Sequence, residues 1–274
     1  MKKIVCMAAF LFAHSFAECP VTPSVEGPVS HYGRLQVREG TPFIDGVKEG
    51  REDIRLVQVR GVSFGWARDN WESVHFYNAN AVERLVKDWK VEILRAAYGQ
   101  TNSLTSQAAI DNLERVRTVI NAAIENDVYI IIDWHSHNAH LEAEKERAKQ
   151  FFEEMAQEYG SCDGVIFELF NEPVCANGAS SCMPADRTTW PQIKEYAEEV
   201  IPIIRAHSPN LILVGTPDWS QKVQDAIGNA IDDANVGYVV HFYSASHDLN
   251  LNANINRNHI NRALDDALPV FVTE

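Results

Sequence analysis

The sequence predicts an α/β protein, a (β/α)₈ barrel whose chain ends on the seventh strand. Short apolar runs rich in β-branched residues alternate with amphipathic helical segments along most of its length. These runs are too apolar to leave one face in water, which is typical of parallel strands covered by helices. A dinucleotide-binding sheet is disfavoured, because the glycine-containing stretch Gly61–Gly65 lacks the third glycine of that fingerprint.

A polar N-terminal segment, residues 18–56, precedes the repeating units of the single predicted barrel domain, residues 57–274. Within this segment Gly33–Val37 and Pro42–Asp45 predict a hairpin that caps one end of the barrel. Seven strands are then predicted, at Val57–Phe64, Val91–Tyr98, Val128–His135, Val165–Pro173, Leu211–Thr216, Val236–Ser244 and Pro269–Glu274. The predicted helices are Ala81–Trp89, Ser106–Asp127, Leu141–Tyr159, Trp190–His207, Ser220–Ile227 and Asn254–Ala267.

The helices are expected to bury an apolar stripe. In Ser106–Asp127 this stripe begins at Ile110, and Trp89 and Trp190 are expected to be core or cap residues of their helices. The chain stops at the tip of the seventh strand. A (β/α)₈ barrel needs a further helix, an eighth strand and its helix, about 50 residues at the usual size of the fold. We therefore expect the sequence to be a fragment of a longer protein.

Residues 1–17 have the pattern of a secretory signal peptide. Lys2 and Lys3 precede the apolar run Ile4–Phe12 and a small-x-small site at Ser15–Ala17. The run is too short to span a bilayer, and a short buried or anchoring helix is the alternative. We therefore expect a secreted protein, extracellular or periplasmic, without a membrane partner. The formal charge of −14 disfavours nucleic acid as a partner.

Four cysteines remain after residue 17, and four cysteines allow three pairings. We favour Cys175–Cys182, because these residues flank a short polar loop just after the fourth strand. Cys19–Cys162 is then the remaining pair, and free thiols are the alternative. A metal site is disfavoured, because no histidine shares the cysteine spacing.

Ionisable side chains gather at the predicted carboxyl ends of the strands. Alternate residues of a strand share a face, so the following sets are expected to point together: Arg95 on strand two; Asp133 and His135 on strand three; Glu168, Phe170 and Glu172 on strand four; His241 and Tyr243 on strand six; Val270, Val272 and Glu274 on strand seven. Two carboxylates at one mouth are what glycoside hydrolysis requires. Phosphate loops and nucleophilic Ser or Cys patterns are lacking, and neither cofactor nor metal is expected.

Six blocks of the sequence resemble glycoside hydrolase family 5, in its cellulase subgroup of endo-β-1,4-glucanases. They are LRAAYG (94–99), IIDWHSH (131–137), IFELFNEP (166–173), VGTPDWSQ (214–221), VVHFYSASH (239–247) and LPVFVTE (268–274). The resemblance runs from about Gly33 to the last residue. It implies a (β/α)₈ hydrolase that retains anomeric configuration, so residues 57–274 are expected to form a catalytic domain.

The resemblance also implies roles, with Glu172 as acid/base and Glu274 as nucleophile. An acid must arrive protonated, so a raised pKa is expected for Glu172. The other implied contacts are Asn171 to the sugar 2-hydroxyl, Arg95 and Tyr243 to the nucleophile, and His135 and His241 to the −1 sugar or the carboxylates. Deeper in the barrel, Glu168 is expected to be a buried partner of Arg95, and Asp133 a paired core carboxylate.

Aromatic residues near the strand tips are candidate sugar platforms, with loop packing as the alternative. The resemblance suggests a +1 contact for Trp219, and Trp66 and Trp71 are candidates for the −2 or −3 side. His137, His140 and His247 either rim the cleft or are simply exposed, and the sequence does not decide between these.

The expected protein is thus a monomeric, secreted endo-β-1,4-glucanase acting on β-glucan by double displacement. The alternatives are a β-mannanase, xylanase or mixed-linkage glucanase on the same scaffold, or a non-catalytic carbohydrate-binding barrel.

Overall fold

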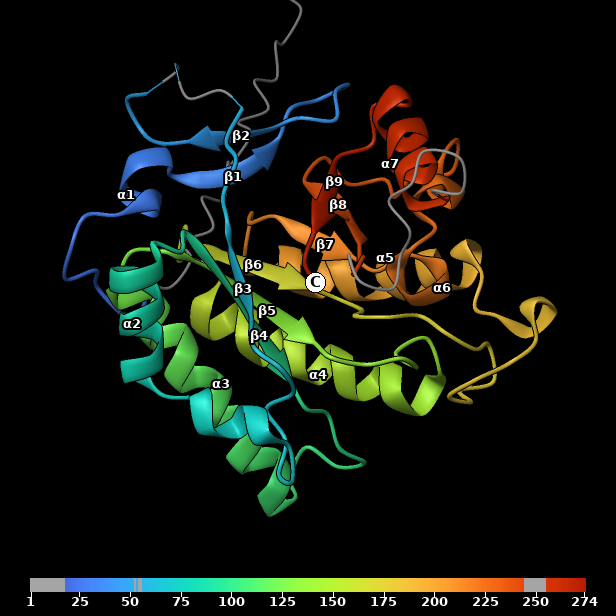
Figure 1. Ribbon diagram of the computed structural model, residues 1–274, viewed down its shortest axis with the longest axis horizontal. Helices are drawn as coiled ribbons and strands as arrows, with labels where there is room; N and C mark the ends of the chain where they lie inside the picture. The colour runs from blue at the N-terminus through green and yellow to red at the C-terminus, as the bar shows by residue number, and fades with distance from the viewer. Residues whose placement is uncertain (1–17, 52, 54–55, 244–254) are drawn as a thin grey trace, which may run out of the picture.

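The centre of the molecule is a curled parallel sheet of seven strands (Figure 1). The computed structural model describes residues 18–51, 53, 56–243 and 255–274. The sheet keeps chain order: β3 (Gly61–Ser63), β4 (Ile93–Tyr98), β5 (Tyr129–Trp134), β6 (Val165–Glu168), β7 (Ile212–Val214), β8 (Val236–Val240) and β9 (Val270–Val272). The predicted α/β class and the predicted order of the seven strands are confirmed. The predicted signal peptide, residues 1–17, lies outside the described residues.

Helices cover the outer face of this sheet (Figure 1). They are α2 (Ala79–Trp89), α3 (Gln107–Glu125), α4 (Glu142–Tyr159), α5 (Trp190–Arg205) and α7 (Ile255–Asp265). The four-residue α6 (Pro217–Ser220) instead follows the carboxyl end of β7, and short 3₁₀ turns occur at Glu72–Phe76, Pro184–Asp186 and Val223–Ala226. Side-chain caps fix two starts: Asn78 accepts from the N–H of Ala81, and Ser106 from that of Ala109. The five-residue helix α1 (Pro28–Tyr32) was not among the predicted elements.

The period of two along each strand separates two apolar clusters. One faces the helices and contains the strand residues Leu94, Ala96, Ile130, Ile132, Phe167 and Val240. The other faces the interior and contains Ile93, Tyr129, Ile131, Ile166, Leu213 and Val239. The interior is therefore filled by side chains and is not a pore.

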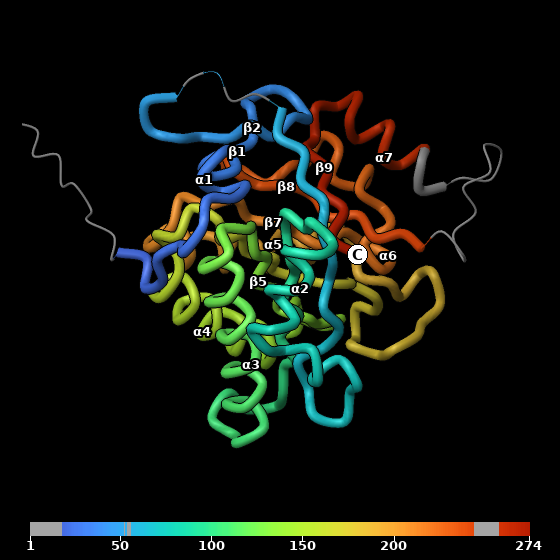
Figure 2. Tube along the Cα trace, turned by 60° about the vertical axis from the view of Figure 1, so that its left-hand side comes forward, coloured from blue at the N-terminus to red at the C-terminus, as the bar shows by residue number. Residues whose placement is uncertain are grey.

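A hairpin closes the amino end of this interior (Figure 2). Strands β1 (Arg34–Val37) and β2 (Ile44–Val47) pair antiparallel, and Leu35 and Ile44 join the interior cluster. The N–H of Val37 donates to Oδ1 of Asn235, one residue before β8, at 3.0 Å. Because the hairpin covers the amino end, the candidate site residues at the carboxyl ends of the strands lie at the opposite, uncovered end of the sheet.

Two predicted core residues are wrong. Ile110 is 44% exposed and Trp89 is 72% exposed, although both continue apolar stripes at helical spacing. Each lies in an end turn of its helix, where fewer neighbours surround a side chain than at the middle. Trp190 is buried as expected, and its indole N–H donates to the carbonyl of Asn229 at 2.8 Å.

The predicted face assignments hold on β4, β5 and β6 and fail past the end of β6 and on the edge strand β9. β6 ends at Glu168, and Phe170 packs against Tyr196 on the helix side, with ring centroids 5.6 Å apart. On β9 it is Phe271 that packs on the interior cluster, while Val272 is half-exposed. Phe170 and Val272 therefore do not share a face with the glutamates, and Glu274 reaches the mouth from a position past the strand end.

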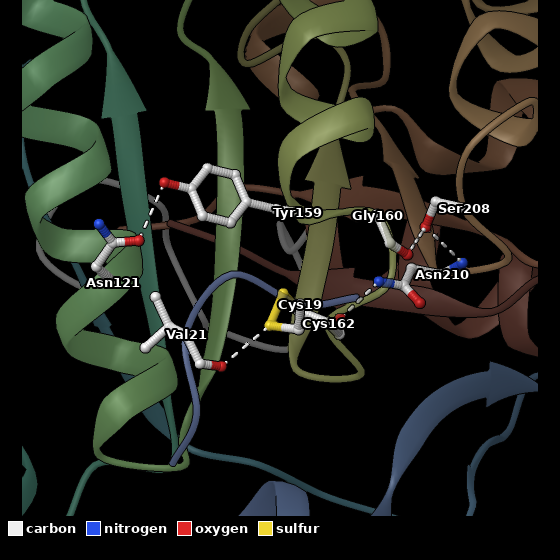
Figure 3. Close-up of a disulfide and its surroundings, with 8 residues drawn as sticks. All are labelled: Cys19, Val21, Asn121, Tyr159, Gly160, Cys162, Ser208 and Asn210. Atoms are coloured by element: carbon white, nitrogen blue, oxygen red, sulfur yellow. Dashed lines mark hydrogen bonds between the residues drawn. A yellow bond between two sulfur atoms is a disulfide. The ribbon is translucent and has the colours of Figure 1, made fainter. Parts of the chain in front are cut away.

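Two disulfides join the four described cysteines in the expected pairs, Cys175–Cys182 and Cys19–Cys162. The second ties the N-terminal segment to the loop between α4 and β6 (Figure 3). That loop is also held by Asn210, whose amide donates to the carbonyl of Cys162 at 2.8 Å. Reduction of the Cys19–Cys162 disulfide is therefore expected to loosen the amino end of the barrel and not its mouth.

The sheet has two end strands, β3 and β9, and remains open between them. The predicted first strand began at Val57, yet β3 is confined to Gly61–Ser63. A groove of about 460 Å³ lies between β9, the segment that precedes β3 and the hairpin, and it is lined in part by Leu35, Phe43, Val57, Val59, Val270 and Val272. Within the described ranges, none of the helices has the length and apolar character needed to cross a bilayer.

Candidate active site

A charged layer lies directly above the apolar interior layer. Four interior apolar residues are each followed, two positions later on the same face of the strand, by a polar one. Arg95 follows Ile93, Asp133 follows Ile131, Glu168 follows Ile166 and His241 follows Val239. All four are buried. Because the strands are parallel, their carboxyl ends meet at one mouth, and this layer forms its floor.

Arg95 is the centre of the layer. Its Nε and Nη2 donate to the two oxygens of Glu168 at 2.7 and 3.2 Å, and Nη2 lies 2.9 Å from Oδ2 of Asp133. The predicted Arg95–Glu168 pair is confirmed, and Asp133 is a paired core carboxylate as expected. Burial alone would lower the pKa of Arg95, but the surrounding carboxylates raise it, so the guanidinium stays charged.

Glu274 rests on this cation. Nη1 of Arg95 donates to its Oε2 at 3.0 Å, and the hydroxyl of Tyr243 donates to Oε1. Burial raises the pKa of Tyr243 and the bond to Glu274 raises it further, so the phenol remains a donor. Glu274 therefore presents a partly exposed carboxylate held from two sides by groups that do not lose their protons near neutral pH.

Glu172 has different neighbours. Nδ1 of His241 lies 3.1 Å from its Oε1, and Nε2 of His137 lies 3.3 Å from its Oε2. Burial raises the pKa of Glu172, but the hydrogen bonds from His137 and His241 outweigh it and lower the pKa to about 2. The expected raised pKa is therefore wrong for the unliganded protein, because two histidines distant in sequence converge on this carboxylate.

Thr273 extends the contacts of His241. Its hydroxyl donates to Oε1 of Glu168 at 2.9 Å and lies 2.8 Å from Nε2 of His241. Since the hydroxyl proton points to Glu168, it is Nε2–H of His241 that donates to Thr273. Sequence reasoning missed Thr273, because strict alternation placed it opposite Glu274. His241 is thus fixed by partners on both ring nitrogens.

Asn171 and His135 complete the mouth. Oδ1 of Asn171 accepts from Nη2 of Arg95 at 2.7 Å, which directs its amide N–H₂ elsewhere. Nδ1 of His135 lies 2.6 Å from Oδ2 of Asp133. Burial lowers the pKa of His135 well below its usual range, so this ring is neutral and donates from Nδ1. The structure therefore gathers seven predicted site residues at one mouth: Arg95, His135, Asn171, Glu172, His241, Tyr243 and Glu274.

Aromatic rings flank the mouth on the β3 side. Trp66 stacks on Trp71, with centroids 5.2 Å apart and rings 12° from parallel. Its edge also meets the rings of His135 at 4.9 Å and His137 at 6.1 Å. A tryptophan pair therefore adjoins the histidine that contacts Glu172.

Trp219 follows β7 beside the disulfide-stapled loop. Asp218, Trp219 and Ser220 all have left-handed backbone angles, with φ of 61°, 56° and 55°. Such angles are costly for residues other than glycine and persist where surrounding contacts impose them. The N–H of Trp219 donates to the carbonyl of Pro173 at 3.0 Å, and the guanidinium of Arg187 lies 5.3 Å from its ring centroid. The turn thus holds Trp219 next to the segment that carries Glu172.

Metal chemistry has no evident ligand set here. In the part of the chain that the structure describes, no group of three or more His, Cys, Asp or Glu side chains is arranged to hold a metal ion. Of the three undecided histidines, His137 contacts Glu172, and His140 lies 3.2 Å from the carbonyl of Ala176. His247 lies outside the described residues.

Comparison with known proteins decides the family. The family model for cellulases of glycosyl hydrolase family 5 matches residues 47–274. The chain belongs to glycosyl hydrolase family 5. Endoglucanase Z of Dickeya dadantii is 42% identical over 216 residues, which cover 78% of this chain and 46% of that protein. Cellulase CelDZ1 of a Thermoanaerobacterium species is 38% identical over 250 residues, 88% of this chain and 62% of that protein.

Solved structures of the family agree with the fold. The catalytic domain of Thermobifida fusca endoglucanase Cel5A matches with a TM-score of 0.73 at 32% identity, covering 90% of this chain and 75% of that one. A glutamate-to-glutamine variant of the same domain, solved in complex with cellotetraose, matches with a TM-score of 0.70. The predicted family and barrel class are confirmed. The chain spans about half the length of the curated relatives it matches.

Proposed function

We propose that the protein is a retaining endo-β-1,4-glucanase in which Glu274 is the nucleophile and Glu172 the acid/base. The observation that carries this proposal is the pair of carboxylates at one mouth, held by opposite kinds of donor. Arg95 and Tyr243 hold Glu274, whereas titratable histidines hold Glu172. A nucleophile must stay ionised, and an acid/base must gain and lose a proton in each cycle.

The roles follow from these contacts. Glu274 attacks the anomeric carbon from the Arg95 side while Glu172 protonates the departing glycosidic oxygen. In the second step Glu172 takes a proton from the attacking water, and the bond to Glu274 breaks. Arg95 and the Tyr243 hydroxyl fix the oxygens of Glu274 before the reaction, so little reorganisation is needed as charge moves.

The proposed substrate is an internal β-1,4-linkage of glucan. Relatives named as endoglucanases and the cellotetraose complex of a family member support it. Asn171 is proposed to donate to the sugar 2-hydroxyl, with Trp66 and Trp71 as stacking platforms on the minus side and Trp219 on the plus side. β-Mannan, xylan and mixed-linkage glucan are the competing substrates. Relative kcat/KM on these polymers separates them.

We also propose that the protein is secreted and acts as a monomer. The two disulfides support an oxidising compartment. Detection of the mature N-terminus after residue 17 in the culture medium or periplasm tests export. Light scattering of the purified protein tests the monomer.

The test of function is hydrolysis of carboxymethylcellulose by the wild type and by Glu172→Gln and Glu274→Gln variants. We expect rapid loss of viscosity with the wild type and none with either variant. Glu153→Gln, on the exposed face of α4, is the matched control and should behave as wild type. Glucan binding without turnover by the wild type would instead support a carbohydrate-binding barrel.

A further inference from the structure

The resting state of Glu172 conflicts with its proposed role. A general acid must deliver a proton, yet both of its carboxylate oxygens are engaged by histidine nitrogens. A carboxylate accepts in such contacts, so the proton resides on the imidazole side. Some group must therefore hand a proton to Glu172 once the sugar is bound, and the candidates are the two histidines.

His137 is placed by a rigid turn. Its neighbour Ser136 is fully buried, and the Ser136 hydroxyl donates to Glu144 of α4 and accepts from the N–H of Asn138 at 2.8 Å. The carbonyl of Ser136 accepts from the N–H of Glu172 at 3.1 Å. The turn is thus bonded both to α4 and to the backbone of Glu172, which fixes His137 opposite that side chain.

The two histidines differ in their access to water. His241 is fully buried, and its second nitrogen is committed to Thr273 and through it to Glu168. The side chain of His137 is 33% exposed, and its ring meets the edge of Trp66. Of these two rings, only that of His137 is accessible to solvent.

We propose that His137 is a second proton-carrying residue of the active site, which shares one proton with Glu172 and reloads it. In the resting pair the proton lies on Nε2 of His137. When a sugar replaces water beside Glu172, this proton passes to Oε2 and then to the glycosidic oxygen as its bond to the anomeric carbon breaks. In the second step Glu172 takes a proton from water and returns it to His137, so the cycle closes without net proton gain.

Other charged and titratable groups lie beside this pair. They come from five of the seven strands: Arg95 on β4, Asp133 and His135 at β5, Glu168 on β6, His241 and Tyr243 after β8, and Glu274 after β9. Arg95 is matched by three carboxylates within 3.0 Å. The His137–Glu172 pair therefore lies beside a layer in which three carboxylates share the guanidinium of Arg95.

The inference rests on the proposed function and is tested with two substrates of one glycone. 2,4-Dinitrophenyl β-cellobioside has a leaving group that needs no proton, whereas cellotetraose needs one. The His137→Asn side chain keeps a hydrogen-bond donor but has no proton that it can transfer to Glu172. We therefore expect kcat/KM on cellotetraose to fall about 10- to 100-fold. On the dinitrophenyl substrate kcat/KM, which reports formation of the covalent intermediate, should stay within about two-fold. The basic limb of the cellotetraose pH profile should move at least one pH unit lower, because the proton is no longer retained by an imidazole.

The controls separate the possible failures. His75→Asn, an exposed histidine in the 3₁₀ turn Glu72–Phe76, should change neither substrate. His137→Gln, a longer amide, should repeat the His137→Asn result if proton transfer is what is lost. Equal losses on both substrates, or an unmoved basic limb, would overturn the role of His137 while leaving the glucanase proposal intact. Failure of the wild type on both substrates would instead overturn the proposed function.

Discussion

The environments of Glu172 and Glu274 differ in the kind of group that holds each carboxylate. Glu274 meets a guanidinium and a phenol, which keep their protons at all ordinary pH values. Glu172 meets two imidazoles, that of the buried His241 and that of the partly exposed His137. One barrel mouth thereby places two carboxylates in different electrostatic surroundings.

The scaffold explains why the difference is stable. Arg95 is anchored below the mouth by Glu168 and Asp133, so the cation beside Glu274 cannot move away. His137 sits on a turn at the rim, where solvent reaches it. Depth within the barrel therefore separates the buried guanidinium of Arg95 from the solvent-accessible imidazole of His137.

The largest expected effect comes from removing each carboxylate in turn. For Glu274→Ala, kcat/KM should fall about 10⁴-fold or more on every substrate, because no covalent intermediate forms. For Glu172→Ala, the loss on cellotetraose should be about 10²- to 10⁴-fold and much smaller for formation of the intermediate from 2,4-dinitrophenyl β-cellobioside. Burst kinetics measure this step. Identical behaviour of the two variants would erase the distinction between the carboxylates.

Removing the fixed cation should cost stability as well as activity. Arg95→Met leaves Glu168 and Asp133 buried without their partner, so we expect a loss of about 3–5 kcal/mol in the free energy of unfolding. Urea denaturation measures it. The double variant Arg95→Met/Glu168→Leu should recover part of that loss. A single variant as stable as the wild type would show that the charged layer is not held by Arg95.

The buried partner of Arg95 should make stability depend on acid. Burial raises the pKa of Glu168, but Arg95 and His241 outweigh it and lower the pKa to about 2 from 4.5. A lowered folded pKa contributes stability that is complete above about pH 4.5 and is lost as the pH falls toward 2. The linked loss is on the order of 3 kcal/mol. Glu168→Gln should weaken the dependence of the unfolding free energy on pH over this range. A dependence as steep as that of the wild type would contradict the pairing of Glu168 with Arg95.

The smallest effect is expected at the phenol. Tyr243→Phe removes one hydrogen bond to the charged Glu274 but leaves Arg95 in place. We expect about a 10- to 100-fold drop in kcat, since such a bond is worth roughly 1.5–3 kcal/mol. Steady-state kinetics on cellotetraose measure it. A larger loss than that of Glu172→Ala would reverse the proposed ranking of the two environments.

Local patterns predicted the layers of this fold and much of the mouth. The spacing of two along the strands placed Arg95 and Glu168 in the interior, and their pairing followed from charge. The same rule failed for Phe170 and Thr273, because the strands end before them and the backbone turns. Alternation applies only while neighbouring strands enforce it.

Contacts between residues far apart in the chain could not be predicted from local sequence patterns. The turn that carries His137 is fixed by Ser136 on Glu144, a contact between a loop and a helix. No local pattern shows that this histidine meets Glu172, and so the pKa of Glu172 was predicted in the wrong direction. Trp89 shows the converse, since an apolar stripe does not show where a helix ends relative to the sheet.

The central claim is that Glu172 and Glu274 act on one sugar from opposite sides with retention. The most direct test follows the anomeric protons of newly released cellobiose by NMR during hydrolysis of cellotetraose. The β-anomer should appear first and the α-anomer only later, by mutarotation. Initial release of the α-anomer would contradict the account, because it would mean that water attacks directly and Glu274 forms no bond to the sugar.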